Sequence, residues 1–220
     1  MTILARHFYQ QEDVVDLSKQ LLGKWLVTEF EGKRSGGMII ETEAYKGAED
    51  KACHAYGNRR TKRTEVMFSQ GGVAYIYLCY GIHNLFNIIT NQQDIPHAIL
   101  IRALLPDIGI EIMKKRRKTE KNLTSGPGTL CQALGIDRSH TGHLLTQSPI
   151  WIEDRGFHFE KNQILSTPRI GVSYAEEDAL LPWRFVLESS ALLSVKKPLE
   201  KHAKKGQDTG ELQKVLVNEL

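Results

Sequence analysis

The sequence has few of the features that mark disulfide-stabilised, zinc-binding or membrane-spanning proteins. Its 220 residues include only three cysteines, Cys53, Cys79 and Cys131, which lie far apart and form no CxxC pair. This spacing argues against both a disulfide framework and a structural zinc site. No stretch approaches the roughly 18 consecutive apolar residues of a membrane helix, and the apolar run at the N-terminus is too short for a signal peptide. We therefore expect reduced thiols and a protein that is neither secreted nor embedded in a membrane.

Internal repeats, proline- or serine-rich linkers and low-complexity blocks are also absent from the sequence. Hydrophobic residues make up 41% and charged residues 25%, close to the averages of soluble globular proteins, so disorder and coiled coil are poor explanations. We expect one domain over residues 1–195. A basic C-terminal tail over residues 196–220 follows it, and this tail either adds nonspecific affinity or is disordered.

Positive charge is concentrated in three runs, although the net charge of the chain is only +3. Residues 59–63 (RRTKR), 114–121 (KKRRKTEK) and 196–205 (KKPLEKHAKK) carry +4, +5 and +4. Any single run can be a solvated helix or tail face, but three in one small chain favour a polyanionic partner. Because no amphipathic apolar face accompanies them, nucleic acid is favoured over a membrane surface.

Segments with strand character outnumber helical ones. Helices are expected over residues 13–22 and 107–121 and from Pro127 through residue 134. Aromatic and β-branched segments bounded by turn residues predict strands at 25–30, 38–45, 73–80, 83–90 and 97–105, with two or three more after residue 150. The polar stretch EGKRSGG between the first two predicts a hairpin. We predict an α+β fold: a single domain with a curved, mainly antiparallel sheet, a protruding β-hairpin and surrounding helices.

Two carboxylates and an aromatic ring share one face of a predicted strand. In GMIIETEAYKG, alternation places Glu41, Glu43 and Tyr45 on the same side. Taken alone, this pattern fits a solvated strand face better than a site. Arg102, however, is a lone charge in the apolar segment AILIRALL, and a buried guanidinium needs an anionic partner. We predict that Glu43 is that partner, and that it can take a proton from water when a reaction intermediate draws the water in.

Tyrosines cluster in the next predicted hairpin. Tyr75 and Tyr77 share a strand face, whereas Tyr80 falls at the following turn, where its ring can project outward. Core packing is the commoner role for Tyr75. Asn87 and His54 are polar side chains in apolar surroundings, where each needs hydrogen-bond partners. Rings near a carboxylate, an outward-facing aromatic and basic runs together fit an enzyme that takes a base out of a duplex and fills the gap.

These motifs resemble the alkyladenine (3-methyladenine) DNA glycosylase family, the methylpurine type of base-excision repair enzyme. The likeness runs from Tyr9 to about residue 193 and is carried by ETEAY with His54 downstream, YIYLCYG followed by Asn87, LIRAL, and SGPGTLCQALGI. The resemblance implies that Glu43 is the general base that activates the attacking water, assisted by Arg102. The zinc-deaminase signature and the GK[ST] phosphate loop are both missing, so no metal and no cofactor are expected.

The resemblance also implies a pocket for the flipped base. Its residues would be Tyr45, His54, Tyr77, Asn87 and Leu100. Among them Asn87 would crowd the exocyclic amine of normal guanine, and Leu100 would line or gate the pocket. Tyr80 would insert into the minor groove, and Ser125 and Gly126 would offer backbone N–H groups to a phosphate.

The expected function is that of a monofunctional DNA glycosylase. It would flip alkylated or deaminated purines out of duplex DNA and hydrolyse the N-glycosidic bond, initiating base excision repair. No lysine lies in the catalytic segment to form a Schiff base, since Lys46 has the opposite parity to Glu43, so no lyase activity is expected. The expected partner is double-stranded DNA with damaged purines. The expected state is a monomer, in the cytoplasm with the nucleoid, or in the nucleus of a eukaryote.

Two other functions fit parts of this pattern. In a non-catalytic nucleic-acid-binding module, the basic runs would bind and Glu43 would be structural. In a small-molecule transferase or hydrolase on a related fold, the basic runs would be incidental. Loss of base release in Glu43→Gln with DNA binding retained would separate the enzyme from the first, and binding to lesion-bearing duplex that weakens steeply with salt would disfavour the second.

Overall fold

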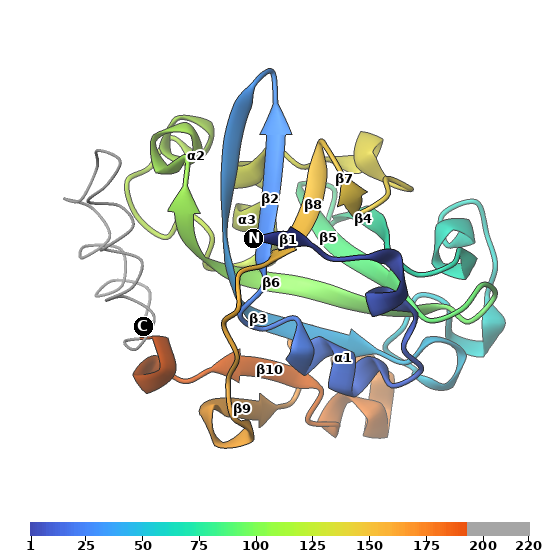
Figure 1. Cartoon of the computed structure of the whole chain (residues 1–220). Coiled ribbons are helices and arrows are strands. Elements are labelled where there is room, and N and C mark those ends of the chain that lie inside the picture. Colours follow the sequence, from blue (N-terminus) through green and yellow to red (C-terminus); the bar gives the residue numbers. More distant parts are fainter. Residues whose placement is uncertain (193–220) are drawn as a thin grey trace.

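The computed structural model describes residues 1–192, so the predicted tail over 196–220 lies outside the described residues. A ten-stranded antiparallel sheet dominates the structure, with the order β1-β8-β2-β3-β6-β5-β4 along its main path and β7, β9 and β10 paired beside it (Figure 1). The strands are β1 (Thr2–Ile3), β2 (Trp25–Phe30), β3 (Lys33–Tyr45), β4 (Val73–Cys79), β5 (His83–Thr90), β6 (His97–Ile108), β7 (Thr146–Gln147), β8 (Ile150–Asp154), β9 (Ile164–Thr167) and β10 (Arg184–Leu187). The predicted α+β fold with a curved antiparallel sheet is confirmed.

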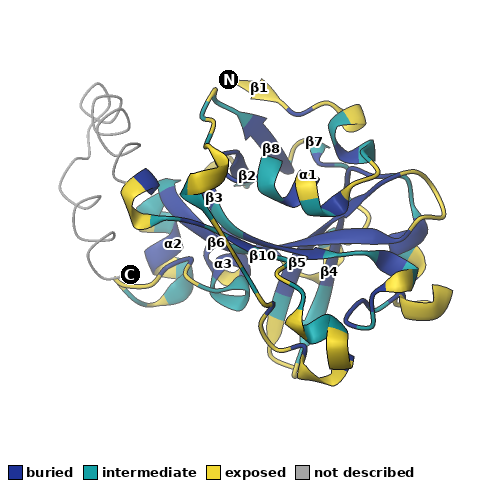
Figure 2. Ribbon diagram, turned by 90° about the horizontal axis from the view of Figure 1, so that it is seen from below, coloured by how far each residue is buried: buried dark blue, intermediate teal, exposed yellow. Residues whose placement is uncertain are grey.

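Helices cover both faces of this sheet. The α-helices are α1 (Val14–Gln20), α2 (Ile110–Arg117) and α3 (Pro127–Leu134). Short 3₁₀ segments are formed by Arg6–Gln10, Gly47–Glu49, Tyr56–Asn58, Glu65–Phe68, Arg138–His140, Lys161–Gln163 and Ser173–Leu180. Helix α1 packs on β3 and β6 from one side, whereas α3 packs on β5 and β6 from the other (Figures 1 and 2). Figure 2 also shows that the middle strands are buried while the turns and loops around them are exposed.

Helix α1 forms where its periodicity predicts. The Asp13 side chain accepts hydrogen bonds from two backbone N–H groups of the first turn, which caps the helix. Leu17 and Leu21 are completely buried on its inner face. The chain leaves the helix at Gly23, whose φ of +83° favours glycine.

The first hairpin is longer and its turn shorter than expected. Strand β3 begins at Lys33, directly opposite Phe30, so only two residues of EGKRSGG form the turn. Both of them have positive φ, as a tight hairpin connection requires. Gly36 and Gly37 lie inside β3, where a Cβ would come within 2.7 Å and 2.4 Å of neighbouring backbone oxygens. These glycines therefore permit close strand approach and are not turn residues.

The predicted helix over 107–121 is shorter than its sequence pattern. Strand β6 continues through Pro106 to Ile108, and α2 occupies only Ile110–Arg117. The proline is tolerated because the pairing of β6 with β3 is irregular at this point. Lys118 adopts the left-handed conformation and ends the helix.

Strand β3 changes its partner halfway along, and this positions its acidic residues. Its first half pairs with β2, whereas Glu41 to Glu43 pair with β10, and β6 pairs with the other edge from Gly36 to Tyr45. Bulges on either side of Glu41 accompany this change. Within the described part of the chain, no helix is long and apolar enough to cross a membrane.

Candidate active site

The Glu43 carboxylate is the centre of a buried polar cluster at the end of β3. Its Oε2 accepts a hydrogen bond from the Tyr45 hydroxyl at 2.8 Å, and its Oε1 accepts one from the backbone N–H of Ile170 at 2.7 Å. Arg102 Nη1 lies 3.3 Å from the same Oε1. The expected ion pair between Glu43 and Arg102 is therefore present. Both carboxylate oxygens have donors, as complete burial of the side chain requires.

Arg102 has a second anionic partner. Its Nε donates to Glu41 Oε1 at 2.8 Å, and the same oxygen accepts from Arg184 Nε at 2.6 Å. Burial opposes the charge on Arg102, but the carboxylates of Glu43 and Glu41 outweigh it and raise the pKa of Arg102 above its ordinary value. The guanidinium is thus a fixed cation in contact with two carboxylates.

An aromatic cavity of about 240 Å³ opens beside this cluster. Pockets for drug-sized ligands are roughly 300–1,000 Å³, so this cavity suits a smaller, flat ring system. All five expected pocket residues line it: Tyr45, His54, Tyr77, Asn87 and Leu100. Arg102 and Ile170 line it as well, whereas Glu43 lies behind them and does not. The carboxylate is therefore next to the cavity and shielded from it.

The His54 ring packs edge to face on two tyrosine rings of the cavity. The His54 and Tyr77 centroids are 4.6 Å apart with an interplanar angle of 76°. Tyr75, which is buried, also lines the cavity, with its hydroxyl 2.9 Å from His54 Nδ1. Burial raises the pKa of Tyr77 and of Tyr75. Burial, and then the charges of Arg63 and Arg59, lowers the pKa of His54 to about 4. These three rings are therefore uncharged at neutral pH.

Asn87 lies at the centre of the sheet that forms the cavity wall. It is opposite Tyr75 on β4 and opposite Leu100 on β6. Its side-chain amide donates to the backbone oxygens of Tyr75 and Leu85 at 3.2 Å and 3.3 Å. Because both amide hydrogens are used inside the hairpin, the orientation of this side chain is fixed against the cavity.

Tyr80 projects from the tip of the β4–β5 hairpin. The last paired residues are Cys79 and His83, and Tyr80 begins the turn with a positive φ of 49°. The side chain is 88% exposed, and its neighbour Ile82 is 72% exposed. Tyr80 also lines the mouth of the cavity. The expectation of an outward-facing ring at the hairpin tip is therefore correct.

The start of α3 adjoins this hairpin. Ser125 is exposed, but the Gly126 N–H donates to Thr129 Oγ1 at 3.0 Å and is not free in this structure. A Cβ at Gly128 would come within 2.9 Å of the His83 ring, so the hairpin tip packs directly on the first turn of the helix. The hairpin and the helix start therefore form one continuous rim.

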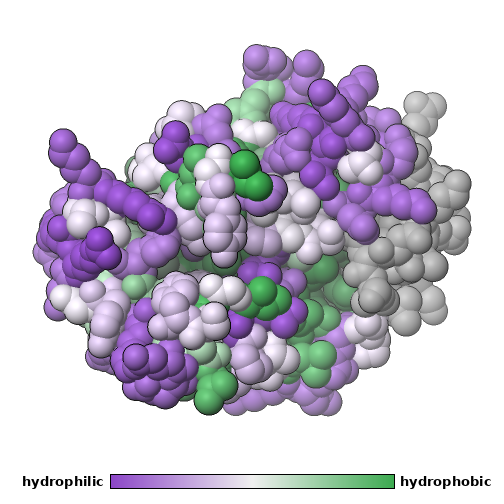
Figure 3. Space-filling model, turned by 180° about the vertical axis from the view of Figure 1, so that it is seen from behind, coloured by the Kyte–Doolittle hydropathy of each residue, from purple (hydrophilic) through white to green (hydrophobic). Residues whose placement is uncertain are grey.

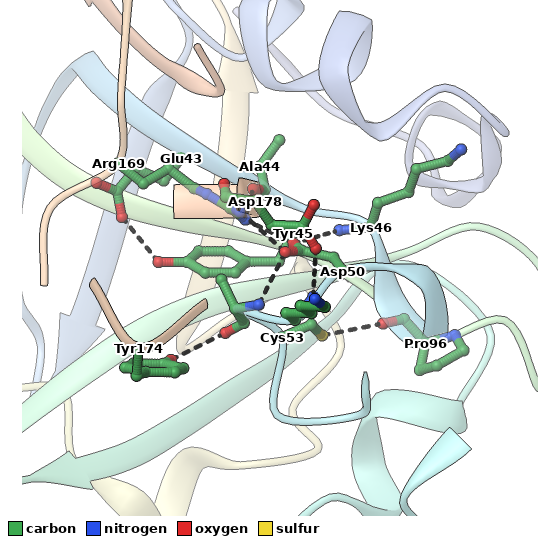
Figure 4. Close-up of polar contacts among 12 residues, drawn as sticks. Glu43, Ala44, Tyr45, Lys46, Asp50, Cys53, Pro96, Arg169, Tyr174 and Asp178 are labelled. Atoms are coloured by element: carbon green, nitrogen blue, oxygen red, sulfur yellow. Dashed lines mark hydrogen bonds and ion pairs between the residues drawn. The ribbon is translucent and has the colours of Figure 1, made fainter. Parts of the chain in front are cut away.

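A buried ion pair, which the sequence did not predict, lies next to this cluster. The side chains of Arg169 and Asp50 are completely buried, with Nη2 donating to Oδ1 at 2.9 Å. The guanidinium lies 4.8 Å from the Tyr45 ring centroid and 5.2 Å from that of Trp183. Figure 4 shows Arg169, Asp50 and Tyr45 together. Figure 4 also shows the Tyr45 hydroxyl turned to Glu43. Arg169 has no periodic or compositional signal, and 119 residues separate it from Asp50.

Tyr174, from the same segment, is a second residue of the site that the sequence did not predict. Tyr174 is 64% exposed, lines the cavity and donates through its hydroxyl to the backbone oxygen of Ala52 at 3.1 Å. Together with Ile170 it forms the rim opposite the β4–β5 hairpin. The sequence around Tyr174 has no pattern from which a role in the cavity could be predicted.

Several cations of the described basic runs are engaged within the protein. Arg60 pairs with Glu65 and Asp94, and Lys114 pairs with Glu111 and Glu120. Arg116 and Arg117 also hydrogen-bond within the fold. Part of the positive charge that suggested a polyanion therefore serves packing. The third run lies outside the described residues.

The surface opposite the view of Figure 1 is grooved. Figure 3 shows a hollow across this face, with hydrophobic and pale surface along it and strongly hydrophilic surface on the flanking rims. Among the described residues, no group of three or more His, Cys, Asp or Glu side chains is placed to hold a metal ion.

Comparisons with known proteins identify the family of this chain. The family model for methylpurine-DNA glycosylase (MPG) matches residues 7–191. A Chlamydia abortus protein named "Putative 3-methyladenine DNA glycosylase" is 50% identical over 189 residues, covering 84% of this chain and 98% of that protein. Proteins of the same name are 42% identical over 206 residues in Desulfitobacterium hafniense (89% and 100% covered) and 45% identical over 199 residues in Bacillus cereus (86% and 97% covered). This chain therefore belongs to the methylpurine-DNA glycosylase family of N-glycosyl-bond hydrolases, as its motifs predicted.

Proposed function

We propose that this protein is a monofunctional DNA glycosylase that flips damaged purines out of duplex DNA and hydrolyses their N-glycosidic bond with a water activated by Glu43. The observation that carries the proposal is the buried Glu43 carboxylate, held by Tyr45, Arg102 and the Ile170 N–H behind an aromatic cavity. Within this family, such a cavity is the natural place for an extruded base.

The role of Glu43 follows from the charge that develops during the reaction. As the purine leaves C1′, positive charge builds on the sugar, as in glycoside hydrolysis. An ionised carboxylate stabilises that charge and deprotonates the water that traps it. Glu43 is shielded from the free cavity, so in this proposal the developing cation draws the water towards the carboxylate, and Arg102 holds the carboxylate in place.

The cavity residues are assigned to the base. Tyr45, His54 and Tyr77 would hold the purine between their rings, and Leu100 would close the pocket. The fixed amide of Asn87 would crowd the exocyclic amine of guanine and so exclude the normal base.

The rim residues are assigned to the DNA. The exposed Tyr80 would enter the minor groove and occupy the space left by the flipped nucleotide. Ser125 and Gly126 would contact a phosphate, for which the Gly126 N–H must leave Thr129. We expect the protein to act as a monomer, in the compartment that holds the DNA.

Lysine-based chemistry has no support at this site. No lysine is among the described residues that line the cavity, and Lys46 Nζ pairs with Glu49 at 2.7 Å. We therefore expect hydrolysis without a Schiff base and without strand cleavage.

The test is incubation with duplexes that each hold one hypoxanthine, ethenoadenine or 3-methyladenine, with no added metal. The proposal predicts free base and an abasic site in an intact strand for at least one lesion. Binding to all three duplexes without base release would favour the non-catalytic module, and strand cleavage at the abasic site would contradict monofunctional hydrolysis.

A further inference from the structure

Arg63 contacts two residues that line the aromatic cavity, His54 and Tyr77. Its Nη2 lies 3.3 Å from His54 Nε2, and its guanidinium carbon lies 5.2 Å from the Tyr77 ring centroid. A second cavity of about 430 Å³ is lined by Arg63 and Arg59, and His54 lines both this cavity and the aromatic one. The imidazole therefore separates the two cavities, and Arg63 contacts it from the second cavity.

The contacts of His54 define which nitrogen carries its proton. A guanidinium only donates hydrogen bonds, so the Nε2 atom facing Arg63 must be the acceptor of a neutral imidazole. The proton is then on Nδ1, which donates to the Tyr75 hydroxyl at 2.9 Å. Arg63 and Tyr75 therefore select the same tautomer from opposite edges of the ring.

We propose that Arg63 is a positioning residue that holds His54 as a neutral imidazole with its proton on Nδ1, so that the base cavity presents an uncharged wall to a cationic alkylated purine. This inference rests on the proposed function for the identity of the ligand only. The state of His54 itself is a property of the free protein.

The charges that surround His54 agree with the geometry. Tyr75 and Tyr77 face it as neutral hydroxyls, and Arg63 and Arg59 face it as cations. Lys51 and Tyr174 line the second cavity too, but Lys51 pairs with Glu176 and Glu177. Apart from burial, the lowered pKa of His54 is caused by Arg63 first and Arg59 second. A protonated His54 would set an N–H against a guanidinium, with two like charges in contact.

This arrangement matters for the substrates of the proposed reaction. Purines alkylated on a ring nitrogen are cationic in the nucleoside, so a charged His54 would repel them. Hypoxanthine is neutral and would be affected less. Below about pH 6.5, where a free imidazole gains a proton, Arg63 would thereby favour cationic lesions without touching them.

The test is nitrogen-15 NMR of the His54 ring in the free protein as a function of pH, in three matched variants. Arg63→Met removes the charge and the donor at similar length, and Arg63→Lys keeps both. Arg60→Met removes a guanidinium of the same segment that pairs elsewhere, with Glu65 and Asp94. Arg63 is exposed, so these variants are expected to fold.

We expect the Nδ1–H tautomer in the wild-type protein. In Arg63→Met, the pKa of His54 should rise from about 4 towards the 6.5 of a free imidazole without reaching it, because burial persists, while Arg63→Lys and Arg60→Met should resemble wild type. An Nε2–H tautomer in the wild-type protein, or the same pKa in Arg63→Met, would overturn the proposal. So would equal shifts in Arg63→Met and Arg60→Met.

A second readout uses activity. In Arg63→Met, release of 3-methyladenine relative to hypoxanthine should fall at about pH 5.5 and recover at about pH 8, as His54 loses its proton. An unchanged ratio would overturn the link to cationic bases. If the wild-type protein releases no base, the proposed function fails, whereas the NMR result still decides the role of Arg63.

Discussion

Individual hydrogen bonds fix the position of Glu43, the candidate general base. Each oxygen of the Glu43 carboxylate has at least one donor, and the donors come from three places in the chain: Tyr45 on the same strand, Arg102 on the neighbouring strand, and the Ile170 backbone. This fixes one orientation of the carboxylate inside the protein. Loss of one donor should therefore change the reaction rate more than DNA affinity.

Tyr45→Phe tests this at the residue scale. The ring that lines the cavity remains, while the hydroxyl that holds Glu43 Oε2 is removed. A hydrogen bond to a charged group contributes about 1.5–3 kcal/mol, so we expect base release to slow by about 10- to 100-fold. Single-turnover kinetics and a duplex-binding titration measure the two effects separately. A wild-type rate would show that this hydrogen bond has no part in the reaction.

The residue pattern predicted only the part of this cluster that alternates along strands. Period-two alternation brought Glu41, Glu43 and Tyr45 to one face, and the rule that a buried arginine needs an anion brought Arg102 to them. The Ile170 N–H could not be predicted, because it comes from an irregular segment 127 residues away from Glu43. Backbone donors of loops leave no trace in side-chain patterning.

At the scale of elements, the Arg169–Asp50 pair joins the segment after β9 to the loop after β3. Arg169 also donates to the backbone oxygen of Ala44 at 2.9 Å, and its guanidinium lies between Tyr45 and Trp183. The cavity wall at Tyr45 thus depends on a contact between distant parts of the chain.

Arg169→Met should therefore destabilise the fold strongly. It leaves Asp50 buried without its cation, which typically costs about 3–5 kcal/mol. Arg184→Met is the matched control. Arg184 is more exposed, and its partner Glu41 remains paired with Arg102 in this variant. We therefore expect the free energy of unfolding to fall by about 1 kcal/mol. Urea unfolding of both variants makes the comparison, and equal losses would contradict a special role for the buried pair.

The β4–β5 hairpin makes a different prediction, because the Tyr80 side chain at its tip is exposed. Tyr80→Ala should leave the melting temperature unchanged, since the side chain is 88% exposed. Release from duplex DNA should fall, because nothing then fills the space of the flipped base. Release from single-stranded DNA, which needs no wedge, should be unaffected. Equal activity on duplex substrate would refute the role of Tyr80.

Helices and strands were predicted correctly where the local sequence signals agree, and they were misplaced where tertiary contacts decide the structure. Helix α1 has apolar periodicity, an aspartate cap and a terminal glycine, and it forms as expected. Pro106 suggested a helix start, but an irregular position in the β3–β6 pairing accepts it within a strand. The glycines Gly36 and Gly37 suggested a turn, but they allow strands to approach closely. In both cases the deciding neighbour is distant in sequence.

At the scale of the whole molecule, the buried His54 links stability to pH. An unfolded histidine binds a proton near pH 6.5, whereas His54 in the folded protein has a pKa of about 4. The stability contributed by its burial is therefore present above pH 6.5 and is lost as pH falls towards 4. The loss should be of the order of 3 kcal/mol.

This pH effect is measured by urea unfolding of wild type and His54→Gln across that window. The wild-type protein should lose more stability than the variant as the pH falls, because carboxylates contribute equally to both. His7→Gln, at an exposed histidine, should follow wild type. Parallel curves for wild type and His54→Gln would contradict the lowered pKa of His54.

The central claim is that the buried Glu43 carboxylate performs the hydrolysis, and Glu43→Gln tests it most directly. The measurement is single-turnover release of hypoxanthine from a duplex, with DNA affinity determined in parallel. A positioned general base contributes about 10²- to 10⁴-fold, so release should fall by that factor while affinity is retained. Release at the wild-type rate by Glu43→Gln would contradict the proposed mechanism.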